Sequence, residues 1–318
     1  MYSSLMVPLD GSSHSERALP VALALARRWG AEVELVHVHE LPMAPGLAPR
    51  YDTRLDAEVR EAMRAQLEAT AERLRQEPAG RISTAFLDGP VVPTLQAHAA
   101  ERLPGLIVMT THGRSGLSRL WLGSVADALV RHAGAPVLLL RSDAAPPADD
   151  AGPVFRHVLV PLDGSERAEA VVEHAARLGT SGATNYTLLS VVAPRPIAVR
   201  PYPGTVTPID SDDLADRERE SWTYLDGVAG RLRPSGAQVA IRVVVHPQPA
   251  VGILDAAAAE RVDLIALATR GRAIVPRLVL GSVADKVMRG ADCPVLLLRP
   301  STMEQSAPPP SARESRDL

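Results

Sequence analysis

The sequence predicts two tandem α/β domains, each a doubly wound parallel sheet with helices on both faces. Two motifs occur twice: Val-Pro-Leu-Asp-Gly-Ser begins at Val7 and Val160, and Gly-Ser-Val-Ala-Asp begins at Gly123 and Gly281. A spacing of roughly 155 residues indicates a domain duplication, because the repeats of a solenoid are far shorter. Within each copy strand patterns alternate with helix patterns, which favours parallel strands joined by crossover helices. The apolar content of 46% is enough for two cores.

The first copy is expected to contain five strands. Its first strand, Ser4–Leu9, is an apolar run that ends at Asp10. Ser13 with Glu16 fits a capping box for the helix that follows, and Pro20 is expected to kink that helix. The expected strands are 4–9, 33–38, 81–87, 106–109 and 136–141, and the expected helices are 13–29, 52–76, 91–102 and 124–132.

The second copy repeats this order after residues 142–153, which carry no core residues and are typical of a linker. The expected strands are 158–162, 183–192, 239–245, 264–267 and 294–299, and the expected helices are 210–232, 249–261 and 282–289. We therefore expect domains at 1–141 and 154–299. Residues 300–318 are polar and proline-rich, and are expected to be a disordered tail.

Composition excludes several classes of function. The formal charge of −3 gives no electrostatic case for binding nucleic acid. Cys293 is the single cysteine, which excludes an internal disulfide framework and a cysteine metal cluster. The sequence has neither a signal peptide nor a run of ~18 apolar residues to span a bilayer, so we expect a cytoplasmic protein without membrane contact. Lys286 is the only lysine, which excludes a Walker P-loop and a protein-kinase strand lysine.

An apolar strand, a glycine-containing loop and a helix start follow one another in each copy. A glycine lets the backbone come close to a ligand, and the N–H groups and dipole at a helix start favour an anion. In sheets of this class ligands bind at the carboxyl ends of the strands. The sequence therefore predicts a phosphate cradle at that edge, where Asp10 and the turn at Gly89 are also expected.

These residues resemble the universal stress protein family. The signature Gly-x2-Gly-x9-Gly-Ser/Thr is matched through its later positions, from Gly113 to Ser124 and from Gly271 to Ser282. The Val-Pro-Leu-Asp-Gly-Ser motif precedes it and Pro-Val-Leu-Leu-Leu-Arg follows it, in both copies. The resemblance covers residues 1–141 and 154–299. It implies five-stranded parallel sheets of order 3-2-1-4-5, and ATP binding without efficient catalysis.

The resemblance also implies which residues hold the nucleotide. An aspartate after the first strand and a valine in the second would hold adenine, and the loop glycines with the helix start would meet the phosphates. The expected binding residues are Pro8, Asp10, Val38, Gly113, Arg114, Gly123, Ser124 and Val125, and in the second copy Pro161, Asp163, Val191, Gly271, Arg272, Gly281, Ser282 and Val283. The two arginines could pair with phosphate or with a nearby carboxylate.

Three departures from the family pattern bear on these sites. The first signature glycine is replaced by Thr110 and Ala268, whose small side chains are expected to narrow the cradle without destroying it. After the third strand, Gly89-Pro90 of the first copy is matched with Gln248-Pro249, which is expected to crowd the ribose edge of the second copy. Pro276 lies in the middle of the second glycine loop.

Two of the expected contacts have structural alternatives. Ser124 lies three residues before Asp127, and Ser282 before Asp285, which is the spacing of a capping box, so a helix cap alone would explain the serine. The cap and the contact are compatible if the hydroxyl changes partner on binding. Asp10 and Asp163 could be simple turn residues at a strand end.

Three other residue types invite a chemical role that we do not expect. His112 lies beside the cradle, but its counterpart is Arg270, which argues against acid–base catalysis. His37 and His39 share a strand face that would suit a metal, but the second copy has Ser190 and Val192 there. Cys293 is expected to be packed and unreactive.

The leading hypothesis is an ATP-binding, non-enzymatic sensor or regulator of stress physiology, with a nucleotide site in each domain. ATP is the expected cofactor, with a role for Mg²⁺ left open, and no catalytic or resident metal site is expected. One alternative is a nucleotide-independent interaction protein of the same fold, which Thr110 and Ala268 favour. Another is a slow ATP hydrolase. The sequence names neither the stress nor the partner protein.

The fifth strands predict how the two domains assemble. Residues 137–140 and 295–298 are apolar and would lie at a sheet edge, where unpaired strands invite association. The family resemblance implies that fifth strands pair antiparallel about a two-fold axis. A linker of about twelve residues at ~3.3 Å each can span the return. We therefore expect the two domains to pair within one chain, with homodimerisation through other faces left open.

Overall fold

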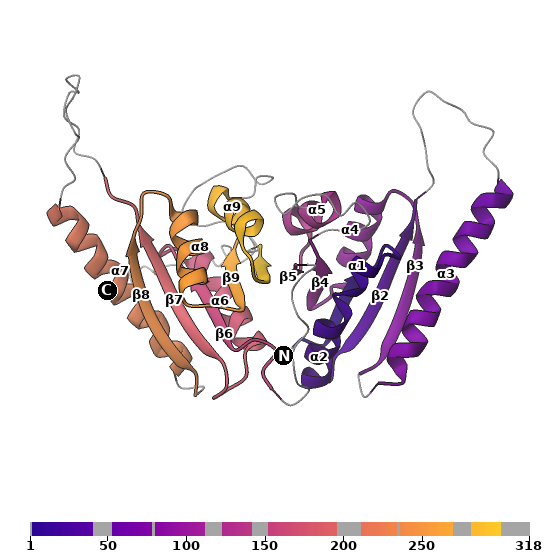
Figure 1. Ribbon diagram of the computed structural model, residues 1–318, viewed down its shortest axis with the longest axis horizontal. Coiled ribbons are helices and arrows are strands. Elements are labelled where there is room, and N and C mark those ends of the chain that lie inside the picture. Colours follow the sequence, from indigo (N-terminus) through magenta and orange to yellow (C-terminus); the bar gives the residue numbers. More distant parts are fainter. Residues whose placement is uncertain are drawn as a thin grey trace, which may run out of the picture.

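The computed structural model describes residues 2–40, 53–77, 80–111, 123–141, 152–195, 211–233, 236–269 and 281–299. These residues form one continuous sheet of ten strands, in the order β3-β2-β1-β4-β5-β10-β9-β6-β7-β8 (Figure 1). Each half has the predicted order 3-2-1-4-5, and within each half neighbouring strands are parallel. The fold class expected from the sequence is therefore confirmed.

The elements of the first half lie close to their predicted positions. They are β1 (Ser4–Pro8), α1 (Ser13–Glu16), α2 (Leu19–Trp29), β2 (Glu32–His39), α3 (Thr53–Arg75), β3 (Ile82–Asp88), α4 (Val91–Arg102), β4 (Leu106–Thr110), α5 (Ser124–His132) and β5 (Val137–Leu140). Inside the sheet of this half, β4 is apolar at four of its five positions and buried along its length, as expected where helices cover both faces of a parallel sheet. β2 is equally buried after Glu32 but also carries Glu34, His37 and His39.

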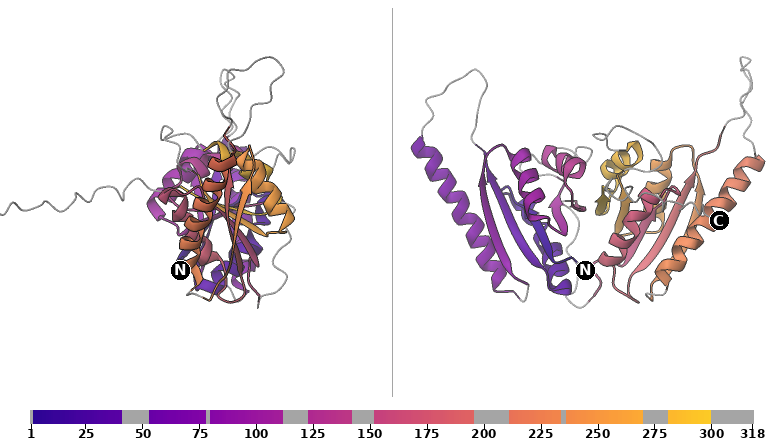
Figure 2. Two further views of the ribbon diagram at one scale, coloured as in Figure 1. Left: turned by 90° about the vertical axis from the view of Figure 1, so that its left-hand side faces the viewer. Right: turned by 180° about the vertical axis from the view of Figure 1, so that it is seen from behind.

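The second half repeats this order, and the helix that follows its first strand is continuous. The elements are β6 (His157–Pro161), α6 (Glu166–Leu178), β7 (Asn185–Val192), α7 (Ser211–Leu232), β8 (Gln238–Val245), α8 (Pro249–Ala259), β9 (Leu264–Ala268), α9 (Ser282–Gly290) and β10 (Val295–Leu298). The long helices α3 and α7 lie at the two outer sides of the molecule (Figures 1 and 2).

The first helical segment is broken as Pro20 predicted, but its cap differs from the prediction. The helix stops at Glu16 and restarts at Leu19, with Pro20 in the first turn of α2, where its missing N–H costs least. The cap of α1 is Ser12, whose hydroxyl accepts from the Ser15 amide at 3.2 Å. The predicted capping box of Ser13 with Glu16 is therefore wrong by one residue.

Two apolar layers cover the sheet, and each extends through both halves. On one face, strand residues such as Leu35 and Leu188 pack under α2, α3, α6 and α7. On the other face, residues such as Val36 and Leu189 pack under α4, α5, α8 and α9. Because both layers cross the boundary between the halves, the two domains share their core.

The fifth strands join the halves at the centre of the sheet. β5 and β10 pair antiparallel, with Leu138 opposite Leu296 and Val137 opposite Leu297. The predicted pairing of the two domains within one chain is therefore confirmed. Residues 142–151 and the predicted tail 300–318 lie outside the described residues.

Candidate nucleotide-binding edges

The register of the parallel strands places Asp10 level with Val38. Pro8 lies opposite Val36, and the next amide, that of Leu9, donates to the Val36 carbonyl at 2.8 Å. The second half has the same arrangement: Pro161 lies opposite Leu189, and the Leu162 amide donates to the Leu189 carbonyl at 2.8 Å. Asp163 is thereby level with Val191. The residues expected to hold adenine thus meet at the carboxyl edge of each sheet half.

The carboxylate of Asp10 orders the turn that leads into α1. Its Oδ1 accepts from the Ser12 amide at 2.9 Å and from the Ser12 hydroxyl at 2.5 Å. Asp163 accepts in the same way from Ser165, at 3.0 and 2.6 Å. The glycine between them has a φ of 79° at Gly11 and 81° at Gly164, in the left-handed region that favours glycine. These aspartates therefore do act as turn residues, which was the structural alternative to a role in binding. The same hydrogen bonds fix the position of their carboxylates.

The helix that forms the other side of each cradle begins at a glycine. Gly123 caps α5 and Gly281 caps α9, and neither helix start has a side-chain cap bond. The Gly123 amide donates to the Thr111 carbonyl at 2.8 Å, and the Gly281 amide to the Thr269 carbonyl at 2.9 Å. Each helix start is therefore held against the end of the fourth strand. The N–H groups of the first helical turn have no partner within the helix, which makes this end suitable for binding an anion.

Ser124 and Ser282 occupy the first helical position and are exposed. The alternative that a capping box explains these serines is wrong, because the preceding glycine is the cap. Val125 and Val283 follow them and are half-buried. Asp127, the other member of the predicted box, instead pairs with Arg131 at 2.7 Å. Both serine hydroxyls are thus left at the surface of the cradle.

Part of the expected site lies outside the described residues. Gly113, Arg114, Gly271 and Arg272 belong to this group, as do His112, Arg270 and Pro276. Their predicted roles stay predictions.

The substituted signature positions, Thr110 and Ala268, lie within strands. Thr110 is buried opposite Leu140, and Ala268 lies opposite Leu298. The backbone there is ordinary extended strand, which any small residue can adopt. Replacement of glycine at this position therefore carries no backbone penalty.

The turn after the third strand differs between the halves. The Gly89 amide donates to the His39 carbonyl, and the His246 amide donates to the Val192 carbonyl, so His246 takes the place of Gly89. The predicted match of Gly89-Pro90 with Gln248-Pro249 is therefore wrong, because the strand register aligns Gly89 with His246, two residues before Gln248. Gly89 has a φ of 137°, whereas His246 Nδ1 accepts from the Gln248 amide at 3.0 Å. An imidazole thus stands at the edge of the second half where the first half has no side chain.

His37 and His39 face away from the Val38 side and are engaged in the α3 layer. His37 Nδ1 lies 2.8 Å from the Leu9 carbonyl, His39 Nε2 lies 2.9 Å from Asp56 Oδ1, and both rings stack on Phe86. Among the described residues no group of three or more acidic, histidine or cysteine side chains is placed to hold a metal ion.

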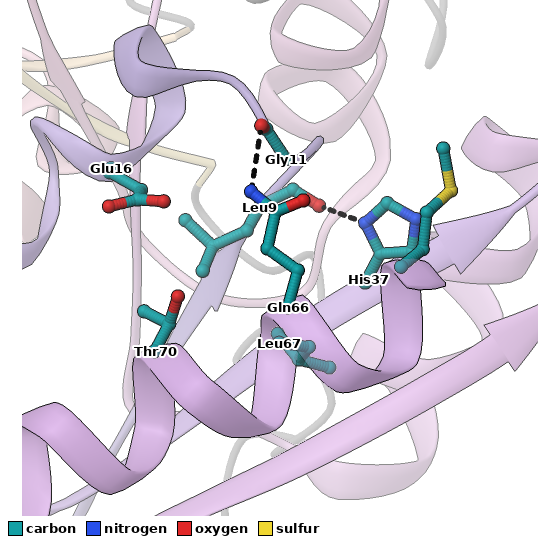
Figure 3. Close-up of a pocket in the computed structure, with 8 residues that line it drawn as sticks. Leu9, Gly11, Glu16, His37, Gln66, Leu67 and Thr70 are labelled. Atoms are coloured by element: carbon teal, nitrogen blue, oxygen red, sulfur yellow. Dashed lines mark hydrogen bonds between the residues drawn. The ribbon is translucent and has the colours of Figure 1, made fainter. Parts of the chain in front are cut away.

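A pocket near the first turn lies on this same α3 face (Figure 3). It is lined by Leu9, Gly11, Glu16, His37, Met63, Gln66, Leu67 and Thr70. Gln66 Nε2 donates to the Gly11 carbonyl across it at 3.1 Å. The pocket has room for about one water molecule, and it is separated by the sheet from Val38. We therefore assign it no role in binding the nucleotide.

Cys293 is half-buried, and burial raises the pKa of its thiol to about 11. Such a thiol is protonated at neutral pH and is a poor nucleophile, which agrees with the packed role expected from the sequence. Within the described residues no helix is both long and apolar enough to cross a membrane.

The fold and its two edges define a class: a tandem α/β protein in which each half carries an aspartate turn after its first strand and a glycine-capped helix after its fourth, at the carboxyl ends of neighbouring strands. Comparison with known proteins identifies the family. The model of the universal stress protein family matches residues 1–141 and again residues 155–299. The chain belongs to the universal stress protein family.

Relatives and solved structures agree with this assignment. A universal stress protein of Mycobacterium tuberculosis strain H37Rv is 28% identical over 306 residues, which cover 93% of this chain and 97% of that protein. One of Methanocaldococcus jannaschii is 29% identical over 141 residues, 44% of this chain and 83% of that protein. The crystal structure of a universal stress protein from Archaeoglobus fulgidus has a TM-score of 0.66 and 18% identity, covering 93% of this chain and 98% of that one. The crystal structure of a putative universal stress protein from Pseudomonas aeruginosa has a TM-score of 0.62 and 20% sequence identity, and the match covers 94% of each chain.

Proposed function

We propose that each half of the chain binds ATP at the carboxyl edge of its sheet, and that the protein is a nucleotide-responsive regulator in a stress response. The proposal rests on one arrangement of residues that occurs at the carboxyl edge of both halves of the sheet. In both halves an aspartate is held level with a valine of one neighbouring strand, and a glycine-capped helix follows the other neighbouring strand at the same edge of the sheet. Membership of the universal stress protein family supports the same reading.

Each part of this edge suits one part of ATP. The carboxylates of Asp10 and Asp163 accept hydrogen bonds, as the exocyclic amine of adenine requires, and Val38 and Val191 offer apolar contact to the base. The N–H groups at Gly123 to Val125, and at Gly281 to Val283, would receive the phosphates with the hydroxyls of Ser124 and Ser282. Pro8 and Pro161 are the last residues of β1 and β6, and would line the same edge next to the base. Gly113, Arg114, Gly271 and Arg272 would close the phosphate loops, and we leave the presence of Mg²⁺ open.

We propose binding rather than efficient catalysis, in the cytoplasm and without nucleic acid as a partner. Efficient phosphoryl transfer needs a positioned base and a cationic clamp on the transferred group. Asp10 and Asp163 already accept two hydrogen bonds from their turns, which favours a fixed acceptor over a proton carrier. A slow ATP hydrolase is the alternative, and phosphate release from ATP by the purified protein would reveal it.

The test is mass analysis of the ligand released when the purified protein is denatured. We expect ATP or ADP from the unmodified chain, and none from the double variant Asp10→Ala, Asp163→Ala. Release of no nucleotide, together with no binding of added ATP, would favour the nucleotide-independent interaction protein instead.

A further inference from the structure

The helices that begin the two proposed phosphate cradles meet at the centre of the molecule. α5 and α9 lie side by side above the paired strands β5 and β10 (Figure 1). Each helix carries an aspartate in its first turn and an arginine one turn later: Asp127 with Arg131, and Asp285 with Arg289. Because the two helices face each other, these four side chains come together.

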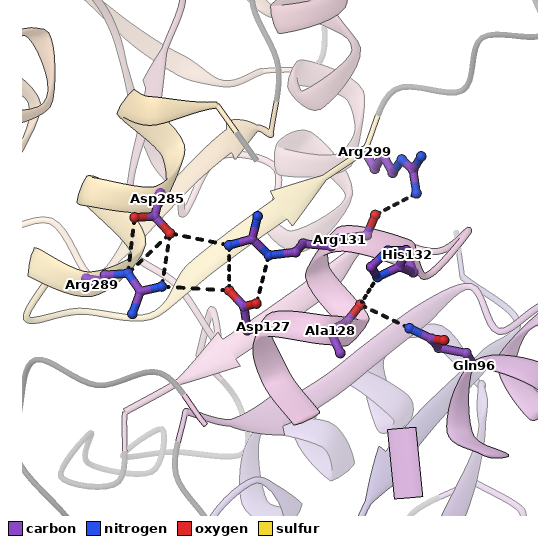
Figure 4. A network of polar contacts seen from close by, with 8 residues as sticks. All are labelled: Gln96, Asp127, Ala128, Arg131, His132, Asp285, Arg289 and Arg299. Carbon is purple, nitrogen blue, oxygen red and sulfur yellow. Dashed lines mark hydrogen bonds and ion pairs between the residues drawn. The ribbon is translucent and has the colours of Figure 1, made fainter. Parts of the chain in front are cut away.

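The four side chains form a ring of alternating charge (Figure 4). Within each helix the pair is short: Arg131 Nε lies 2.7 Å from Asp127, and Arg289 Nε lies 3.1 Å from Asp285. Across the domains Arg289 Nη2 lies 3.7 Å from Asp127, and Arg131 Nη2 lies 3.8 Å from Asp285. Each first-turn carboxylate therefore has one arginine from its own domain and one from the other.

Two further bonds tie the same helices across the boundary. Arg141, just after β5, donates to the Ala291 carbonyl at the end of α9, at 2.7 Å. Arg299, just after β10, donates to the Arg131 carbonyl in the last turn of α5, at 2.5 Å. Both helices are thus held by the opposite domain at their ends, in addition to the ring.

The position of the aspartates gives the ring a consequence for anion binding. The Asp127 amide donates to the Gly123 carbonyl at 3.0 Å, and the Asp285 amide to the Gly281 carbonyl at 2.9 Å. The two aspartates therefore lie about one turn from the glycine caps, about 6 Å along the helix axis. An uncompensated carboxylate there would repel a bound phosphate and offset the favourable field of the helix start.

We propose that Arg289 and Arg131 are positioning residues for the nucleotide site of the opposite domain. Each adds a second positive charge beside the first-turn aspartate of the other domain's phosphate helix, which the arginine of its own helix already pairs, so that the ATP affinity of one half depends on the other. The inference rests on the proposed function. The hydrogen bonds that Arg131 donates to Asp127, with the charges of Asp127 and Asp285, raise the pKa of Arg131 against the opposing effect of burial.

The test measures the first site alone, in the full chain. The background is Asp163→Ala, which removes the carboxylate proposed to hold adenine in the second site and lies outside α9, so the ring is left in place. Calorimetric titration with ATP should then show one site instead of two. In this background we expect Arg289→Gln to weaken ATP binding at the first site about three- to tenfold, although the residue lies in the second domain.

Three comparisons separate this effect from a loss of structure. Arg289→Lys keeps the charge and should restore most of the affinity. The fold-change should shrink as salt is raised, because screening weakens it. Arg233→Gln is the control: Arg233 follows the last residue of α7 and pairs with Asp226 of that helix at 3.0 Å, on the surface of the second domain. This substitution should leave ATP binding at the first site unchanged.

The outcomes are distinguishable. If ATP binds and Arg289→Gln has no more effect than Arg233→Gln, or Arg289→Lys is as weak as Arg289→Gln at every salt concentration, the positioning role is wrong. If the unmodified chain binds no ATP, the proposed function itself fails.

Discussion

At the scale of single residues, two serines with similar sequence surroundings have different roles. Ser165 caps α6, and its hydroxyl accepts from the Ala168 amide at 3.2 Å. Ser124 has the spacing of a cap but lies inside α5, because Gly123 already has the non-helical φ and ψ of −59° and 146°. The spacing of polar residues does not show which of two neighbours leaves the helical conformation, so this role could not be predicted from sequence.

This difference predicts opposite effects of two matched variants. Ser165→Ala should lower the free energy of unfolding by about 1 kcal/mol, because an N–H loses its cap. Ser124→Ala should change it by less than about 0.5 kcal/mol, and should weaken ATP binding at the first site. Urea unfolding and calorimetric titration check the two quantities. A loss of stability in Ser124→Ala equal to that in Ser165→Ala would restore the capping interpretation.

A second residue-scale prediction concerns the contact between Tyr2 and His174, which joins the halves on the α2–α6 side. The Tyr2 hydroxyl lies 2.5 Å from His174 Nδ1, and the rings stack. Burial, followed by the charge of Arg177, lowers the pKa of His174, while Glu173 opposes this shift.

The lowered pKa sets the sign of the pH dependence. Below pH ~6.5 the unfolded chain takes up a proton that the folded protein resists, so the free energy of unfolding should fall as pH drops through that value. Urea unfolding between pH 7.5 and 5 should show a steeper fall for the unmodified chain than for His174→Phe. Parallel profiles would contradict the role given to His174.

At the scale of elements, the junction of the fourth strand and the following helix determines the cradle. A Cβ on Gly123 would lie 3.1 Å from the Thr111 carbonyl oxygen, which accepts the Gly123 amide. The junction thus tolerates a side chain poorly, and a large one would displace the helix start and, in the proposed site, block the phosphates.

We therefore expect Gly123→Ala to weaken ATP binding at the first site at least tenfold, with a loss of about 1–2 kcal/mol in stability. Gly134→Ala is the matched control: it lies two residues after the end of α5, nothing lies within 4 Å of its Cβ, and it should leave both quantities unchanged. Calorimetry and thermal unfolding measure the effects. Normal affinity in Gly123→Ala would place the phosphates elsewhere.

Most elements could be predicted from sequence because their patterns are local. The apolar runs at 106–109 and 264–267, and the break at Pro20, are visible without knowledge of the fold. The turn at His246 was matched to the wrong residue because only the strand register shows that one half has an extra residue. The pairing of Arg289 with Asp127 was not found, because it joins residues that only the assembled domains bring together.

At the scale of the whole molecule, the central strands decide whether the two halves form one unit. Val137 and Leu139 are buried beneath α5 and lie opposite Leu297 and Val295 of the other half. Both apolar layers are continuous across this seam. Loss of the seam would expose two apolar strand edges at once.

The double variant Val137→Asp, Leu139→Asp should therefore lose more than about 4 kcal/mol of folding free energy, seen as insoluble protein or as an early unfolding transition. Leu55→Asp, on an exposed part of α3, is the control and should be neutral. A soluble double variant with the thermal stability of the unmodified chain would show that the seam does not hold the halves together.

The central claim is that the duplicated edge makes two ATP sites in one chain. Its most direct test is the stoichiometry of ATP binding to the purified, nucleotide-free protein, measured by titration calorimetry. We expect two ATP per chain, falling to one with Asp10→Ala or with Asp163→Ala and to none when both are changed. Saturating ATP that binds to neither half, or a stoichiometry unchanged by both substitutions, would contradict it.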